Sequence, residues 1–198
     1  MGDAYFSNAG VFLVETVFDL YILTVMLRFL FQLLRADFYN PVCQFVVKVT
    51  TPVLRPIRRW VPGFGGVDLA AILLMILLKM VETALSSWIQ GYRPGLPALV
   101  MLAVVSLLHL AVYVFLFAVF IRVLLSWIAP DAYSPMSTLL DTLSEPLLRP
   151  ARRLLPPIAG LDLSPIVVII LLQLILMLVI APLGDLAGGL LRAGVGNG

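Results

Sequence analysis

The sequence is poor in charge and almost lacks the two residue types that build disulfides and soft metal sites. Only 12% of its 198 residues are charged, whereas about a quarter is usual in soluble domains. It has one cysteine, Cys43, and one histidine, His109. A single cysteine excludes an internal disulfide and a cysteine-built zinc site, and a single histidine excludes a His-rich metal centre or a bis-histidine haem. We therefore expect no metal and no cofactor.

Signatures of nucleic-acid binding and of common enzyme classes are also missing. The net charge is only +2 and there is no basic tail, so nucleic acid is not an expected direct partner. The chain has no glycine-rich phosphate loop, no HExxH metal motif and no nucleophile elbow. These absences predict a protein that is not an enzyme.

What the sequence has in excess is apolar residues. They make up 62% of the chain, and the mean hydropathy is +1.08, which leaves too little polar surface to cover a soluble core. A bilayer core is about 30 Å thick and needs ~20 apolar residues in a helix, the secondary structure that satisfies its own backbone there. The sequence therefore predicts an all-α membrane protein with four transmembrane helices, at about residues 11–34, 69–89, 99–128 and 163–183.

The distribution of cationic residues predicts how these spans are oriented. Five of them lie between the first and second spans, and three lie between the third and fourth. On the opposite side of the spans, only Arg93 and Arg192 are cationic. Short loops rich in Lys and Arg stay cytoplasmic. Both long connections are therefore expected in the cytoplasm and both termini in the periplasm, as in a multi-pass protein of a bacterial inner membrane.

The chain contains an internal duplication. When the chain is aligned with itself at a constant offset of 94 residues (131 − 37 for Asp37 and Asp131), charged and turn-forming residues coincide. Chance does not explain this coincidence in so apolar a sequence. We expect two repeats, residues 1–94 and 95–198, each a helical hairpin. A unit with two crossings returns the chain to its starting side, so the hairpins are expected to be parallel. Ionisable residues that recur at equivalent positions of the two repeats are Arg28 and Arg122, Asp37 and Asp131, and Asp68 and Asp162.

Each connection has the pattern of an amphipathic helix. Asn40-Pro41 and Ser134-Pro135 combine an N-cap residue with proline at the first helical position. An apolar stripe follows at helical spacing and is too short to cross, so we expect it in the membrane interface, facing acyl chains or the other spans. Proline pairs are expected to end both helices. The stripe comprises Val42, Phe45, Val46, Val49 and Val53, and then Met136, Leu139, Leu140, Leu143 and Leu147; the proline pairs are Pro52/Pro56 and Pro146/Pro150.

Two arginine clusters follow these helices. They are expected to fix topology and bind anionic lipid headgroups, or alternatively to form a specific site for a partner. Asp68 and Asp162 precede the next spans, where a carboxylate caps a helix or pairs with a nearby arginine. The clusters are Arg55, Arg58 and Arg59 in the first repeat, and Arg149, Arg152 and Arg153 in the second.

Ionisable residues within the spans are costly and mark a candidate site. In the first repeat these are Glu15, Asp19, Lys79 and Glu82, and we expect Lys79 to bridge Asp19 or Glu82. The cluster forms either an ion pair that locks the hairpin or a path for a cation or proton. The equivalent residues of the second repeat are His109, Tyr113, Gln173 and Leu176, so the cluster belongs to one half only.

Arg28 and Arg122 differ from that cluster because they recur in both repeats. Each lies near the cytoplasmic end of its span. Pairing with Asp37 or Asp131 is slightly favoured over an extended side chain that reaches lipid phosphates.

The segment Glu145-Pro-Leu-Leu-Arg-Pro-Ala-Arg-Arg, continuing to Pro165, resembles the signature of the YggT family (YlmG in some lineages), and residues 51–69 are a looser copy. The resemblance covers nearly the whole chain, in the two-repeat form. It implies a link to osmotic-shock tolerance and potassium uptake; plastid and cyanobacterial relatives are linked to nucleoid distribution, cell division and cytochrome assembly. It implies no catalytic residue set.

Two functional hypotheses remain open. The first is a membrane scaffold or accessory protein that organises anionic lipid or a membrane-protein partner at the cytoplasmic face. The second is an ion transport protein or oligomeric channel that uses the charged cluster of the first repeat. Four spans are few for a transporter that works alone, so a homo-oligomer or a partner is expected.

Overall fold

Four helices in the structure are long and apolar enough to cross a membrane, as the sequence predicts. The computed structural model describes residues 2–128, 134–155 and 162–195, and the regular elements in these residues are helical. The last span is continuous from Ser164 to Leu191. The elements are α1 (Gly2–Leu33), α2 (Pro41–Arg58), α3 (Leu69–Ile89), α4 (Leu96–Ile128), α5 (Pro135–Leu154), α6 (Ser164–Ile175), the π-helical turn η1 (Leu176–Ile180) and α7 (Ala181–Val195).

The first and last spans extend beyond the apolar runs that predicted them, whereas α3 has the predicted bounds, Leu69–Ile89. α1 begins at Gly2, well before the expected start near residue 11, and the last span continues through α7 to Val195. Hydropathy locates the part of a helix that suits lipid, whereas the backbone hydrogen-bond ladder continues into the flanking residues, although these include Gly2, Asn8 and Gly10, which have low helix propensity. The predicted first and fourth spans are therefore shorter than the helices that contain them.

The turn η1 adapts the fourth span to Pro182. A proline has no backbone N–H, and its ring crowds the carbonyl four residues earlier, which here belongs to Leu178. Leu178 lies within η1, where the helix is wound more loosely. Such π-turns commonly absorb a local mismatch in the backbone ladder, so the span continues past the proline instead of ending.

The connecting helices α2 and α5 begin as predicted. The side chain of Asn40 accepts a hydrogen bond from the backbone N–H of Val42 at 2.9 Å. The hydroxyl of Ser134 accepts one from the N–H of Ser137 at 3.1 Å, and the Ser137 hydroxyl accepts one from the backbone N–H of Ser134 at 2.9 Å. The N-termini of α2 and α5 also contact each other, because the side-chain amide of Asn40 donates a hydrogen bond to the carbonyl of Pro135 at 2.6 Å.

The prediction that proline pairs end these helices is wrong. α2 continues through Pro52 and Pro56, and α5 continues through Pro146 and Pro150. Prolines four residues apart lie on one side of a helix, and all four are exposed. The carbonyls that lose their helical donor therefore face away from the protein core, where other hydrogen-bond donors can reach them.

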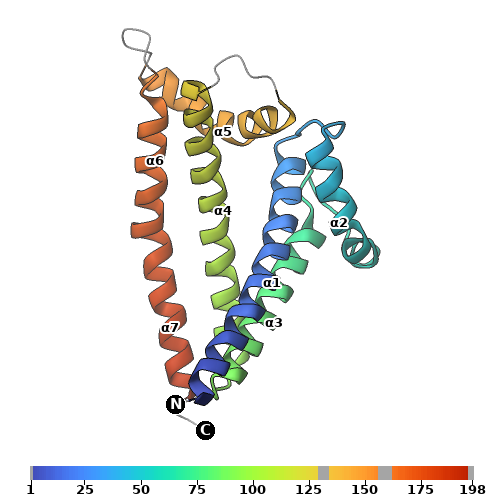
Figure 1. The fold of residues 1–198 in the computed structure, drawn as a ribbon, viewed down its shortest axis with the longest axis vertical. Helices are drawn as coiled ribbons and strands as arrows, with labels where there is room; N and C mark the ends of the chain where they lie inside the picture. The colour runs from blue at the N-terminus through green and yellow to red at the C-terminus, as the bar shows by residue number, and fades with distance from the viewer. Residues whose placement is uncertain (1, 129–133, 156–161, 196–198) are drawn as a thin grey trace.

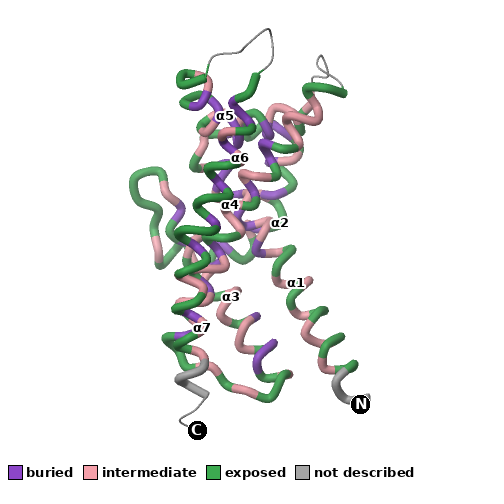
Figure 2. The backbone as a smooth tube through the Cα atoms, turned by 90° about the vertical axis from the view of Figure 1, so that its left-hand side faces the viewer, coloured by how far each residue is buried: buried purple, intermediate pink, exposed green. Residues whose placement is uncertain are grey.

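The helices form two packed groups (Figure 1). α1 packs mainly on α3, whereas α4 packs on α5 and on the fourth span; α3 packs on α4 and so joins the groups. α5 lies across one end of α4 and α6, while α2 runs back along the outside of α1 and α3. The main hydrophobic core contains residues from all of the helices α1, α2, α3, α4 and α5. A smaller core lies among α4, α5 and α6. In Figure 2 the buried residues of α1 lie toward its α2 end.

The apolar stripes of the two connections are covered to different extents. In α5, the stripe residues Leu139, Leu140 and Leu143 are buried. In α2, the buried face is rotated toward Cys43, Thr50 and Leu54, with Val46 the one fully buried member of the predicted stripe. As a result Phe45, Val49 and Val53 remain exposed along α2.

Candidate functional site

The charged residues of the first repeat meet between α1 and α3. Lys79 Nζ lies 2.9 Å from Asp19 Oδ1 and 2.7 Å from Glu82 Oε1, so the predicted bridge is present to both carboxylates. The side chain of Glu82 is 4% exposed and that of Asp19 is 57% exposed. Lys79 and Glu82 share one face of α3 because they are three residues apart. The packing of α3 on α1 brings Asp19 to the same ammonium group.

A small cavity lies beside this ion pair. It has a volume of about 230 Å³ and is lined by polar groups from all three packed helices, among them Glu15 of α1, Thr83 and Ser86 of α3 and Ser106 of α4. The second carboxylate oxygen of Glu82, Oε2, and the hydroxyl of Ser86 are buried in its wall without a hydrogen-bond partner among the described residues. Buried polar groups normally have partners, so these atoms can accept or donate to something that enters the cavity.

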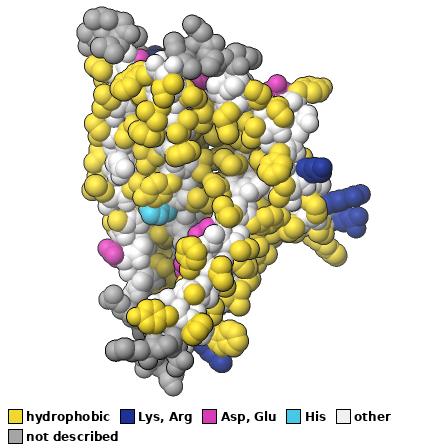
Figure 3. All heavy atoms as spheres, viewed as in Figure 1, with side chains coloured by type: hydrophobic (Ala, Val, Ile, Leu, Met, Phe, Trp, Pro, Cys, Tyr) yellow, Lys and Arg dark blue, Asp and Glu magenta, His cyan; other side chains and the backbone are white. Residues whose placement is uncertain are grey.

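A larger cavity of about 470 Å³ lies on the other side of Lys79, between α1 and α4. Asp19 and Thr16 line it from α1, and His109 and Tyr113 line it from α4. The two rings pack edge to face with centroids 4.7 Å apart. Figure 3 shows the histidine near acidic side chains on an otherwise hydrophobic face.

The sequence analysis places His109 and Tyr113 in the second repeat, apart from the charged cluster of the first repeat. It does not predict that they line the same cavity as Asp19. The signal was available in the repeat itself. These residues are the equivalents of Glu15 and Asp19, so packing of the first helices of the two repeats brings them to one cavity.

Arg28 is held by α2 and not by Asp37, the partner favoured from the sequence. Its guanidinium is buried and donates to the hydroxyls of Thr50 and Thr51 at 2.6 and 3.0 Å, and to the carbonyl of Val47 at 3.2 Å. α2 runs back past α1 and so presents these acceptors to Arg28. Asp37 instead accepts a hydrogen bond from the backbone of Tyr39 at 2.9 Å.

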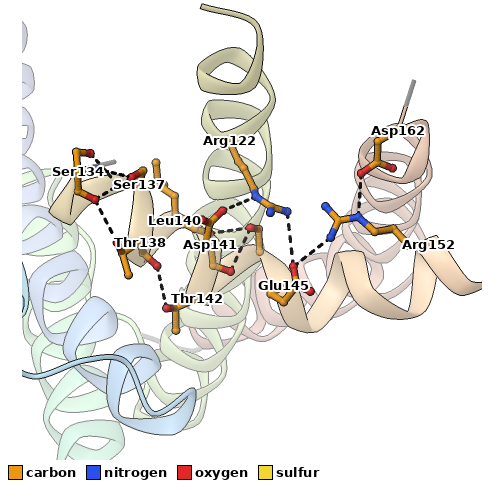
Figure 4. Close-up of polar contacts among 11 residues, drawn as sticks. Arg122, Ser134, Ser137, Thr138, Leu140, Asp141, Thr142, Glu145, Arg152 and Asp162 are labelled. Carbon is orange, nitrogen blue, oxygen red and sulfur yellow. Dashed lines mark hydrogen bonds and ion pairs between the residues drawn. The ribbon is translucent and has the colours of Figure 1, made fainter. Parts of the chain in front are cut away.

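The equivalent arginine of the second repeat binds carboxylates. Arg122 Nε lies 2.5 Å from Asp141 Oδ1, and its Nη1 lies 3.7 Å from Glu145 Oε2 (Figure 4). Both carboxylates come from α5. Asp131, the partner expected for Arg122, lies outside the described residues.

Two residues of the second arginine cluster, Arg149 and Arg152, have carboxylate partners. Arg152 contacts Glu145 Oε2 at 3.3 Å and Asp162 Oδ2 at 2.9 Å, as Figure 4 shows, and Arg149 lies 3.6 Å from Glu145. Partial burial raises the pKa of Asp162, but hydrogen bonds from Ser164 and Arg152 outweigh that effect and hold its pKa below the usual value.

The first arginine cluster keeps more of its charge free. Arg58 pairs with Asp68, which also caps α3 by accepting from the N–H of Ala71 at 3.2 Å. Arg55 and Arg59 are exposed and form no ion pair with any described residue. α2 has no acidic residue to neutralise them, since Val47 and Thr51 occupy the positions equivalent to Asp141 and Glu145.

The four long apolar helices make the chain a multi-pass membrane protein built from a duplicated unit. Residues 7–89 and 101–183 each match the model of the CCB3/YggT family, at the same offset that aligns Asp37 with Asp131. The chain belongs to the CCB3/YggT family. The predicted duplication and the family resemblance are thereby confirmed.

Several relatives resemble the chain over most of its length. An uncharacterized protein of Pseudomonas aeruginosa is 46% identical over 184 residues, which cover 92% of this chain and 93% of that protein. An uncharacterized protein of Vibrio alginolyticus is 40% identical, covering 91% and 96%. The uncharacterized protein YggT of Escherichia coli K12 is 35% identical, covering 86% and 88%. No solved structure matches the chain.

Proposed function

We propose that the chain is a scaffold or accessory protein of a bacterial inner membrane that holds anionic lipid at the cytoplasmic face. In this account residues 1–94 and 95–198 are parallel hairpins with both termini in the periplasm. α2 lies in the cytoplasmic leaflet with its exposed apolar residues among the acyl chains.

The observation that carries the proposal is the combination of free cations and exposed apolar residues on α2. Phe45, Val49 and Val53 are exposed, and Arg55 and Arg59 have no ionic partner among the described residues. Helices of this kind bind bilayer interfaces through buried apolar area and attraction to anionic headgroups. Figure 3 shows cationic side chains gathered at one edge of the molecule beside hydrophobic ones.

The second repeat supplies an internal contrast. α5 buries its stripe against the bundle, and Glu145 lies beside both Arg149 and Arg152. A cation that already has a carboxylate partner attracts a lipid phosphate less strongly. Specific lipid retention should therefore depend on the first cluster more than on the second.

The test compares matched double variants in bilayer nanodiscs that contain phosphatidylglycerol. Anionic lipids that remain bound are counted by native mass spectrometry. Each basic residue near the surface contributes about 1 kcal/mol, so Arg55→Gln with Arg59→Gln should weaken lipid retention by roughly 30-fold. The equivalent pair, Arg149→Gln with Arg153→Gln, should have a smaller effect. Unchanged retention in the first double variant would overturn the proposal.

A second candidate function is movement of a cation or proton through the first repeat. The specific observation in its favour is Glu82 Oε2, which is buried in the wall of a cavity next to Lys79 and has no hydrogen-bond partner within the described part of the chain. Ion flux from purified protein in liposomes tests it, with Asp19→Asn and Glu82→Gln as variants. Flux that the folded variants lose supports this function; absence of flux from well-folded native protein removes it.

A further inference from the structure

The contact between α3 and α4 is the largest interface between the two repeats. On α4, Leu107 and Val114 belong to the main core and are each 8% exposed. On α3, Thr83 and Ser87 line the smaller cavity opposite Ser106, so they mark the face that looks toward α4. Each surface has an equivalent elsewhere in the chain, because the repeats are copies.

Both equivalent surfaces are largely exposed. Leu13, Val17 and Leu20 form a stripe on α1 and are 61%, 64% and 62% exposed, although Leu13 and Leu20 are the equivalents of Leu107 and Val114. On the fourth span, Met177 is the equivalent of Thr83 and is 65% exposed. It continues a stripe with Ile166 and Ile170, which are also exposed. Among the described residues, α1 makes no contact with α6, η1 or α7, so the chain does not close this second interface on itself.

A polar residue in the middle of the fourth span distinguishes a protein partner from lipid. Gln173 is exposed, and its amide has no hydrogen-bond partner among the described residues. It lies ~14 Å along the span from Ser164, near the middle of a bilayer. Acyl chains cannot bind an amide, and interhelical hydrogen bonds are the usual way to satisfy one in a membrane.

The repeat identifies the group that Gln173 would meet. Gln173 is the equivalent of Lys79, which lines the larger cavity opposite Ser106, His109 and Tyr113 of α4. The positions equivalent to those three on α1 are Phe12, Glu15 and Asp19. The side chain of Asp19 is 57% exposed although it lies within a span. Asp19 is paired with Lys79, but a carboxylate that is so exposed within a bilayer is costly, and the amide of Gln173 supplies further donors to it.

We propose that a second copy of this chain packs its fourth span on α1, in the way that α3 packs on α4 within one chain. The Gln173 amide of one copy then donates to the Asp19 or Glu15 carboxylate of the other. The two stripes are different surfaces, so each contact is head to tail and a closed ring of copies covers every stripe. This interface does not depend on lipid binding by α2.

Cysteine cross-linking in native membranes tests the interface. Cys43 is the only cysteine and is replaced in a Cys43→Ala background. Two differently tagged chains are co-expressed, one with Phe12→Cys and the other with Met177→Cys, at the positions equivalent to Ser106 and Thr83. The matched control replaces Met177→Cys by Val179→Cys, because Val179 and its equivalent Leu85 are both exposed and point away from this face. A disulfide that joins the two tags through residue 177 but not through residue 179 is the expected result.

Three outcomes would overturn the proposal. They are no disulfide between the tags, equal disulfide formation through residue 179, and a disulfide that forms only within a chain carrying both Phe12→Cys and Met177→Cys. A second measurement counts copies by single-molecule photobleaching at several dilutions in lipid. Loss of one interhelical hydrogen bond by Gln173→Leu should weaken association roughly 3- to 10-fold. Unchanged association in the folded variant would contradict the role given to Gln173.

Discussion

Arg28 and Arg122 occupy equivalent positions of the two repeats but bind different partners. Arg28 donates to hydroxyls and a carbonyl of α2, whereas Arg122 contacts the carboxylates of Asp141 and Glu145 on α5. In both repeats the arginine ties the first span to the connecting helix that follows it. The two repeats thus share the contact between the first span and the connecting helix. They differ in the acceptors of that contact, which are neutral on α2 and carboxylates on α5.

Removal of Arg28 should destabilise the protein more than removal of Arg122. Arg28 is buried and makes three charged hydrogen bonds, so Arg28→Met is expected to lower the free energy of unfolding by about 2–4 kcal/mol. The side chain of Arg122 is 26% exposed, and Arg122→Met should cost about 1 kcal/mol. Steric-trap unfolding in bicelles measures both. Equal costs, or the reverse order, would show that the buried network of α2 is not the stronger tie.

The ion pair in the first repeat should matter most when only one partner is removed. Lys79→Met leaves Glu82 buried without its counter-charge, a change that costs about 3–5 kcal/mol in other proteins. Adding Glu82→Gln removes the uncompensated charge and should restore a large part of that stability. The same unfolding measurement applies to both variants. If the double variant is as unstable as the single one, the cluster acts through packing and not through charge.

Acid should weaken the contact between Asp162 and the second arginine cluster. The pKa of Asp162 is lower in the folded protein than the ordinary aspartate value of about 3.9. The stability that this group contributes is therefore complete above that ordinary value and is lost as the pH falls through the folded pKa. Asp162→Asn should show a smaller loss of stability on acidification than the native chain. Identical acid profiles would mean that the contact with Arg152 does not stabilise the fold.

Cys43 should report whether α2 is packed as described. Its side chain is buried, and burial together with the nearby Asp37 carboxylate raises the pKa of the thiol, so little thiolate is available at neutral pH. Native protein should therefore react slowly with a water-soluble maleimide and quickly after unfolding. A Lys48→Cys variant in the Cys43→Ala background provides a control on the same helix, because Lys48 is polar and exposed. Rapid labelling of native Cys43 would place this face of α2 away from the bundle.

The number of spans and the duplication followed from the sequence because both depend on local patterns. Apolar length is a property of consecutive residues, and the repeat is fixed by charged and turn-forming residues at one offset. The caps at Asn40 and Ser134 were equally local. The proline pairs were misjudged because their effect depends on which side of the helix is exposed, and sequence alone does not show that side.

The candidate site was only partly predictable, for a related reason. Lys79 and Glu82 share a helix face by spacing, so their pairing was visible. That His109 and Tyr113 line the same cavity as Asp19 depends on how α1 and α4 approach each other. The partner of Arg28 depends on the path of α2 back along α1. Both are tertiary relationships between helices, which periodicity does not determine.

The central claim is that both arginine clusters lie on the cytoplasmic side. Trp60 and Leu154 are equivalent residues next to the two clusters and are both exposed, so each can carry a single cysteine in the Cys43→Ala background. An impermeant maleimide should label Trp60→Cys and Leu154→Cys in inside-out membrane vesicles and neither in intact spheroplasts. Labelling of either residue from the periplasmic side would contradict the account.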